Sequence, residues 1–132
     1  MRLLLDTHIW IWSLIEPDRL SGDVRAALTN PDHDLWLSAI SVWEVLVLIR
    51  KGRLKLGDQA GSEWIARALA QSPVHEAAIT YDVAMASEEL VLDHWDPADR
   101  FIAATAQLRE ATLITAGERL IGCSGSAALA NR

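Results

Sequence analysis

Short apolar runs alternate with longer amphipathic stretches along this chain, and no other feature of the sequence constrains its fold as strongly. Four runs have the length and apolar content of strands: Arg2–Leu5, Asp34–Leu37, Val74–Ile79 and Thr112–Thr115. Because helical stretches separate these runs, the strands are expected to lie parallel in one sheet with helices on both faces. The sequence therefore predicts an α/β protein with a central parallel sheet, built as a single domain over residues 1–132.

Capping residues, prolines and glycines delimit the expected helices. These helices are Ile9–Ile15, ended by Pro17; one from Ser21 through Leu28; one capped by Ser38 or Ser41 that runs to Arg50 and is stopped by Gly52; Ser62–Gln71; one capped by Thr80 that runs through Leu90; and Pro97–Glu110. The tail after Gly122 is rich in Gly, Ser and Ala and yields no assignment.

Composition and charge limit the class of protein. Hydrophobic residues make up 51% of the chain, which argues against disorder, and no apolar run is long enough to cross a membrane. The first residues do not resemble a signal peptide, so a cytoplasmic protein without a membrane partner is expected. Cys123, the one cysteine, allows no internal disulfide and is expected to be a small packing residue.

The formal net charge of -6 is unusual for a protein that binds nucleic acid by bulk attraction. Either the chain does not bind nucleic acid, or its acids serve a local purpose. A carboxylate cluster that holds a divalent cation is such a purpose, because the ion reverses the local charge. The positions of the acids therefore carry more information than their number.

Three acids occupy positions from which they could bind a metal or take part in catalysis. Asp6 follows the first strand and could either cap the next helix or bind a metal. Glu44 is the one ionisable residue between Asp34 and Arg50, so its carboxylate stands alone in an apolar stretch. Asp99 falls in the first turn of the last long helix, where an acid is also favoured by the helix dipole.

The chemistry of these candidates favours a hard cation. Carboxylate oxygens suit Mg²⁺ or Mn²⁺ rather than zinc, and no pair of histidines has the spacing of a zinc motif; the histidines are His8, His33, His75 and His94. A bound Mg²⁺ can activate a water molecule and polarise a phosphoryl oxygen. Phosphodiester hydrolysis is therefore the reaction that the acids favour.

Four segments together resemble the PIN-domain family, and within it the VapC-type toxins of bacterial toxin–antitoxin pairs. They occur in the family's order and span nearly the whole chain. The segments are Leu3-Leu4-Leu5-Asp6-Thr7-His8, Leu37-Ser38-Ala39-Ile40-Ser41-Val42-Trp43-Glu44-Val45, His94-Trp95-Asp96-Pro97-Ala98-Asp99-Arg100-Phe101-Ile102-Ala103-Ala104-Thr105-Ala106 and Ala111-Thr112-Leu113-Ile114-Thr115-Ala116.

This resemblance implies a three-layer α/β/α fold and a Mg²⁺-dependent endoribonuclease that a cognate antitoxin neutralises and that forms a homodimer. It implies metal ligands at Asp6, Glu44 and Asp99, with a further acid at Asp96. The family's fourth acid would follow Thr115 and Ala116, where this chain has Gly117 and then Glu118. Thr115 and Glu118 are therefore accessory candidates.

Two other interpretations of the site stay open at this point. The chain could be a catalytically weakened PIN domain that binds RNA or a partner without cutting, as the glycine at position 117 suggests. It could also be a phosphatase with Asp6 as nucleophile, but those enzymes usually carry a second Asp two positions on, where this chain has His8.

The apolar helix Ile9–Ile15 also allows two interpretations. Its large side chains surround the helix, so they could fill the core or form a groove for an antitoxin helix or a second copy. If they formed such a groove, Trp10→Ala or Trp12→Ala would weaken antitoxin binding without unfolding the protein.

Overall fold

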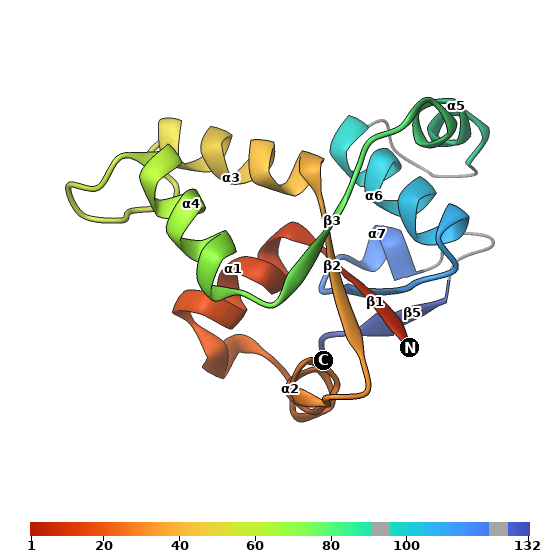
Figure 1. Ribbon diagram of the computed structural model, residues 1–132, viewed down its shortest axis with the longest axis horizontal. Coiled ribbons are helices and arrows are strands. Elements are labelled where there is room, and N and C mark those ends of the chain that lie inside the picture. Colours follow the sequence, from red (N-terminus) through yellow and green to blue (C-terminus); the bar gives the residue numbers. More distant parts are fainter. Residues whose placement is uncertain (91–95, 122–126) are drawn as a thin grey trace.

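A computed structural model describes residues 1–90, 96–121 and 127–132, and Figure 1 shows the path of the chain. The strands are β1 Arg2–Leu5, β2 Asp34–Ser38, β3 Val74–Ala77, β4 Thr112–Thr115 and β5 Ala128–Ala130. The helices are α1 Thr7–Ile15, the 3-10 helix η1 Pro17–Arg19, α2 Gly22–Thr29, α3 Ala39–Arg50, α4 Gly61–Gln71, α5 Tyr81–Glu89, α6 Pro97–Leu108 and α7 Glu118–Ile121.

The five strands form one parallel sheet in the order β3-β2-β1-β4-β5. From β1 the chain first builds the sheet outward through β2 and β3, and later on the other side through β4 and β5. The connections therefore diverge at β1 and β4. In open parallel sheets the crevice at the carboxyl ends of such a strand pair is the usual ligand site.

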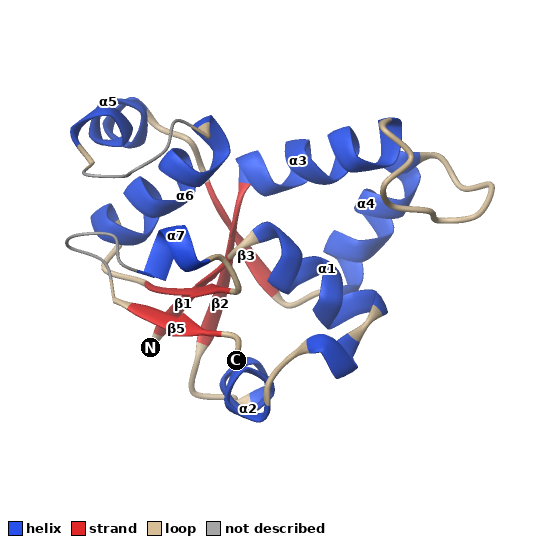
Figure 2. Ribbon diagram, turned by 180° about the vertical axis from the view of Figure 1, so that it is seen from behind, coloured by secondary structure: helices blue, strands red, loops and turns tan. Residues whose placement is uncertain are grey.

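Alternation along β1 explains the two helical layers. Leu3 and Leu5 point into one hydrophobic cluster, which residues of α1, α2, α3 and α4 complete. Leu4 points into the other, which α6 and α7 cover. Figure 2 shows the two groups of helices on opposite sides of the sheet. This is the predicted three-layer α/β/α arrangement, and the run of three leucines reflects a strand buried on both faces.

Most predicted helix starts are confirmed by the caps. The side chain of Ser21 accepts from the backbone N–H of Val24, and Thr80 accepts from Val83. Ser38, not Ser41, caps α3 by accepting from the N–H of Ile40. α1 begins two residues earlier than predicted because Asp6 caps it.

Two elements end two residues before their predicted ends. β3 ends at Ala77 instead of Ile79, because Ala77 pairs with Ser38, the last residue of β2. α6 ends at Leu108 instead of Glu110, because Glu110 adopts φ 53° and turns the chain. α7 and the three-residue β5 were not predicted, since segments of three or four residues are too short to show a periodicity. Cys123 lies outside the described residues.

Trp10 is a core residue, which contradicts its predicted place in a groove, whereas the prediction for Trp12 stays a prediction. Its side chain is fully buried, its indole N–H donates to Ser72 Oγ at 3.3 Å, and its ring packs edge-on against Trp64. The expectation that Trp10→Ala would spare the fold is therefore wrong. Trp12 is only partly buried, with the Arg19 guanidinium 4.2 Å from its ring centre.

No helix in the described parts of the chain is long and apolar enough to cross a membrane.

Candidate active site

Asp6 stands at the carboxyl end of β1, in the crevice between β1 and β4. Its Oδ1 accepts from the N–H of Thr7 at 2.8 Å, which caps α1, and its Oδ2 accepts from Thr115 Oγ1 at 2.7 Å. Its own N–H donates to the carbonyl of Ile114 at 2.9 Å. The sequence left open whether Asp6 is a cap or a ligand. The carboxylate caps the helix, and the same carboxylate also lines a cleft.

Glu44 reaches the same crevice from the second turn of α3. Its Oε1 accepts a short hydrogen bond from the hydroxyl of Thr7, the residue after Asp6. Thr7 is buried, and its hydroxyl also lies 2.9 Å from Ser41 Oγ in a second hydrogen bond. One buried threonine therefore ties the Glu44 carboxylate to the end of β1.

The start of α6 brings in the remaining acids. Asp96 is the N-cap, and its Oδ1 accepts from the N–H groups of Ala98 at 3.0 Å and Asp99 at 3.4 Å. Pro97 follows in the first turn, where its missing N–H costs no hydrogen bond. Asp99 lies in the first turn of the helix and is partly buried.

All four acids line one cleft of about 430 Å³, hereafter the acidic cleft. Its other lining residues are Thr7, His8, Trp12, Ala116 and Gly117. Among the described residues that line it, none is a lysine or arginine. The predicted proximity of Asp6 and Gly117 is therefore confirmed.

The electrostatics of the acidic cleft are unfavourable without a cation. The pKa of the Glu44 carboxyl is raised from its usual 4.5 to about 7, mainly because the side chain is buried. Repulsion from Asp6, Asp99 and Asp96 contributes to this rise, whereas the hydrogen bond from Thr7 opposes it. Near neutral pH, the Glu44 carboxyl is therefore partly protonated, and a bound cation would have to displace that proton.

The donor set fits Mg²⁺ or Mn²⁺. Carboxylate oxygens are the ligands these ions prefer. Within the described residues, no three His, Cys, Asp or Glu side chains are gathered into a ready metal cage. An open cleft of this kind suits Mg²⁺, which keeps several waters and is usually held by few carboxylates.

Of the two accessory candidates, the structure describes the side chain of Thr115 but not that of Glu118. Thr115 is fully buried, and its Oγ1 accepts from the N–H of Gly117 at 2.9 Å while donating to Asp6. It therefore fixes both the carboxylate and the chain that follows β4. Glu118 begins α7, but its side chain, like His94, lies outside the described residues.

Sequence reasoning gave no site role to Thr7 and left His8 as a structural or exposed residue. Thr7 carries the hydrogen bond that aims Glu44, and the sequence signal for it was only its place next to Asp6. His8 is exposed at the cleft, with its ring centre 5.7 Å from that of Trp12. Contacts between α1 and α3 place both residues, and no local pattern encodes such contacts.

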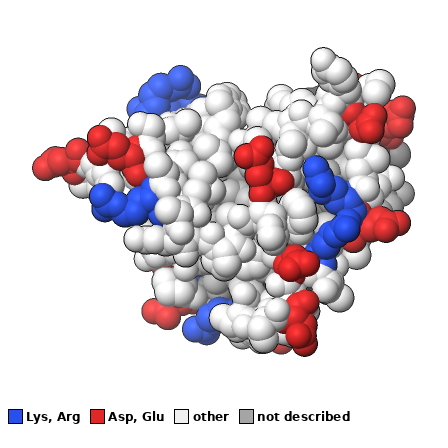
Figure 3. All heavy atoms as spheres, in the orientation of Figure 1, with Lys and Arg blue, Asp and Glu red and all other residues white. Residues whose placement is uncertain are grey.

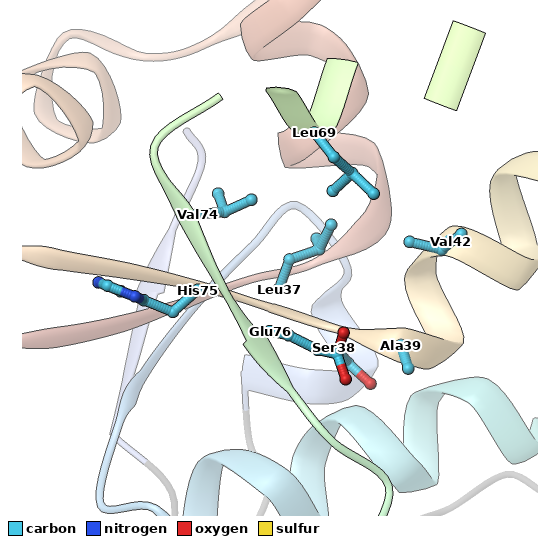
Figure 4. Close-up of a pocket in the computed structure, with 8 residues that line it drawn as sticks. All are labelled: Leu37, Ser38, Ala39, Val42, Leu69, Val74, His75 and Glu76. Carbon is cyan, nitrogen blue, oxygen red and sulfur yellow. The ribbon is translucent and has the colours of Figure 1, made fainter. Parts of the chain in front are cut away.

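A separate hollow of about 410 Å³ lies at the β3 edge of the sheet. In Figure 4, Leu37, Val42, Leu69 and Val74 point toward its interior, whereas His75 points to the other side of the strand. Glu76 is the one acid that lines it. This apolar hollow lacks the grouped carboxylates that a cation needs, so the chemistry is assigned to the acidic cleft.

A model of the PIN-domain family matches residues 3–122 of the chain. The chain belongs to the PIN-domain family. It is 36% identical over 119 residues to Ribonuclease VapC22 of Mycobacterium tuberculosis, an alignment that covers 89% of this chain and 88% of that protein.

Solved structures of PIN-domain proteins share the fold. A toxin–antitoxin complex from Klebsiella pneumoniae contains a chain 25% identical to this PIN domain, with a TM-score of 0.66 and 98% of each chain covered. VapBC2 from Rickettsia felis, bound to a DNA fragment from its promoter, contains a chain with a TM-score of 0.72, again with 98% of each chain covered. At 16% identity, that second similarity shows the fold alone.

Proposed function

We propose that this PIN domain is an endoribonuclease of the VapC type that requires Mg²⁺, with Mn²⁺ as a substitute. The convergence of Asp6, Glu44 and Asp99 on one cleft carries the proposal. A relative 36% identical to this chain is named a ribonuclease, which supports RNA as the substrate.

We assign the ion to Asp6, Glu44 and Asp99, whose carboxylates would hold it. When bound, the ion lowers the pKa of a water molecule and neutralises charge on the phosphoryl group. Thr115 holds the Asp6 carboxylate in place, and Thr7 aims Glu44. Glu44 must lose its proton to serve as a ligand, so ion binding is expected to release a proton near neutral pH.

RNA cleavage by the purified protein should require Mg²⁺ or Mn²⁺, stop on addition of a chelator and leave a 5′-phosphate and a 3′-hydroxyl. A water molecule attacks the phosphorus in this mechanism, so the 2′-hydroxyl of the substrate is not needed. Gel analysis of cleaved RNA, with end-specific phosphatase and ligase treatment, reports both properties. Cleavage that continues in chelator, or a 2′,3′-cyclic phosphate at the cut, would contradict the mechanism.

Gly117→Asp is expected to lower the Mg²⁺ concentration needed for half-maximal cleavage. Gly117 lines the acidic cleft, and an added carboxylate would supply a further charge for the ion. A Cβ at this position would meet only Thr115 Oγ1, at an ordinary contact distance of 3.4 Å, so the substitution should be tolerated.

Gly22→Asp is the matched control, because Gly22 has open space around its Cβ position and does not line the cleft. A folded Gly117→Asp protein whose Mg²⁺ dependence equals that of Gly22→Asp would remove position 117 from the site.

A PIN domain that binds RNA without cutting it is the second candidate, and Gly117 is the observation that favours it. The two candidates differ in the cleavage assay above: a binding module would retain RNA without producing fragments in any divalent cation.

We also propose that a cognate antitoxin protein neutralises this chain and that the chain forms a homodimer. Structural relatives that were solved as toxin–antitoxin complexes support the antitoxin partner. Sedimentation of the purified chain tests the dimer, and loss of cleavage on adding the antitoxin tests neutralisation. A monomeric mass, or cleavage unaffected by the bound antitoxin, would refute the corresponding part.

A further inference from the structure

A second hollow of about 440 Å³ lies beside the acidic cleft. Four of the residues that line it are hereafter called the basic shelf: Trp43, Val47, Lys51 and Arg53. The hollow and the acidic cleft share His8, Glu44 and Asp96 as lining residues. The two spaces are therefore continuous, and a chain-like ligand with one group in the acidic cleft can extend onto the shelf.

Trp43 is exposed although it is large and apolar. Its side chain has 56% of its surface exposed, on the residue next to Glu44. Trp43 and Val47 of α3 and the C-cap residue Lys51 follow one another at intervals of four residues, so they lie along one side of the helix. No aromatic ring from the described residues stacks on Trp43, and its faces are therefore available to a ligand.

The shelf lies within the most basic segment of an acidic protein. Arg50, Lys51, Arg53 and Lys55 are four of the chain's 12 lysines and arginines, and no Asp or Glu occurs from residue 45 to residue 57. Within the described residues, Lys51 and Arg53 form no ion pair. Figure 3 shows Lys and Arg interspersed with Asp and Glu over the face it presents.

The end of α3 places Lys51 and Arg53 in the same hollow. Gly52 adopts φ 71° and donates its N–H to the carbonyl of Ile49 at 3.0 Å, while Arg53 donates to Leu48 at 2.9 Å. This pair of bonds is a Schellman motif, which reverses the chain immediately after the helix. Because the chain reverses here and does not continue along the helix axis, Arg53 lies at the hollow.

We infer that the basic shelf binds single-stranded RNA next to the phosphate to be cut, with a base stacked on Trp43 and backbone phosphates on Lys51 and Arg53. The inference rests on the proposed ribonuclease function and adds to it the site that retains the substrate. An exposed aromatic ring beside lysine and arginine is a general means of binding single-stranded nucleic acid. The acidic cleft repels phosphates, so nearby cations are needed to hold the substrate there.

The test measures RNA affinity separately from cleavage. Binding of a fluorescent single-stranded octaribonucleotide is followed by anisotropy in Mg²⁺, in an Asp99→Asn background that suppresses cleavage. Trp43→Ala should weaken binding about tenfold, and Trp43→Phe should stay within about threefold of the parent, because a phenyl ring still stacks. Tyr81→Ala is the matched control: Tyr81 is 90% exposed on α5 and lines neither hollow.

The salt dependence of the same binding reports the phosphate contacts. The Lys51→Gln and Arg53→Gln pair should reduce the slope of log affinity against log salt by about 1.4, at about 0.7 for each lost phosphate contact on a single strand. Lys55→Gln is the control, because it removes a charge from the same segment without touching the shelf, and its slope should not change.

Unchanged affinity in Trp43→Ala, or an unchanged salt slope in the Lys51 and Arg53 pair, would overturn the inference. The inference would also be overturned if Trp43→Ala altered the mass of the assembly or blocked antitoxin binding while RNA affinity stayed the same. That outcome would make the shelf a protein interface. If the wild type cuts no RNA but binding follows the expected pattern, the ribonuclease proposal fails and the shelf stands.

Discussion

Replacing Asp6 by Asn is expected to lower the rate of RNA cleavage by at least about a hundredfold while the protein stays folded. The substitution removes a full negative charge beside the proposed ion. The remaining amide oxygen can still accept from the N–H of Thr7 and cap α1, and the Thr115 hydroxyl can rotate to accept from the new amide. Activity and stability are therefore separable at this position.

Asp99→Asn should show a loss of similar size, since Asp99 reaches the same cleft from α6. Asp34→Asn is the matched control: Asp34 opens β2 at the opposite end of the sheet and is exposed. Initial rates on one RNA substrate, with thermal unfolding as a check of the fold, give the comparison. A folded Asp6→Asn protein that cuts at the wild-type rate would remove Asp6 from the site.

Glu44→Gln is expected to abolish cleavage and yet stabilise the metal-free protein at pH 8. The reason is that the ionised Glu44 carboxylate is held, half-buried, beside three other acids. Glutamine keeps the shape and can still accept from the Thr7 hydroxyl, but it carries no charge. The charge of Glu44 is therefore expected to be needed for cleavage and to destabilise the metal-free folded protein.

The sign and size of this effect follow from the pKa of Glu44. The folded protein holds the proton more tightly than the unfolded chain, so the stabilisation it provides is complete below pH 4.5 and is lost as the pH rises through about 7. For a fully desolvated group the rise would correspond to about 3 kcal/mol. Since Glu44 is partly exposed, about 1 kcal/mol is expected, or about 4 °C in Tm.

Thermal unfolding in chelator at pH 5 and pH 8 measures this difference. Glu44→Gln should exceed the wild type at pH 8 and approach it at pH 5. Glu88→Gln, an exposed change of the same kind on α5, should show no such pH-dependent gain. A Glu44→Gln protein that is less stable than the wild type at pH 8 would show that the carboxylate is not electrostatically strained.

The parts of the fold that the sequence predicted are those with strong local signals. The run of Leu3, Leu4 and Leu5 is typical of a short strand buried on both faces, and the caps at Ser21 and Thr80 indicate where two helices begin. In a parallel sheet, the residues that follow neighbouring strands lie at the same edge, so the proximity of Asp6 and Gly117 could be predicted from the sequence.

The rest depends on contacts between distant segments. Sequence alone could not show that Trp10 is core and Trp12 lines the cleft, because a helix apolar on all sides does not reveal which side faces the sheet. The hydrogen bond from Thr7 to Glu44 depends on how α1 packs against α3. The basic shelf depends on a turn at Gly52 that returns Arg53 to the helix face.

Binding of Mn²⁺ to the RNA-free protein, followed by electron paramagnetic resonance, tests the metal assignment most directly. We predict that each chain binds one Mn²⁺ at the acidic cleft and that excess Mg²⁺ displaces it. Gly22→Asp should bind Mn²⁺ with the affinity of the wild type, whereas Asp6→Asn and Asp99→Asn should lose this binding. Binding by both of these variants with wild-type affinity would contradict the assignment of Asp6 and Asp99 as ligands, and the absence of any Mn²⁺ binding by the wild type would contradict the proposed metal site itself.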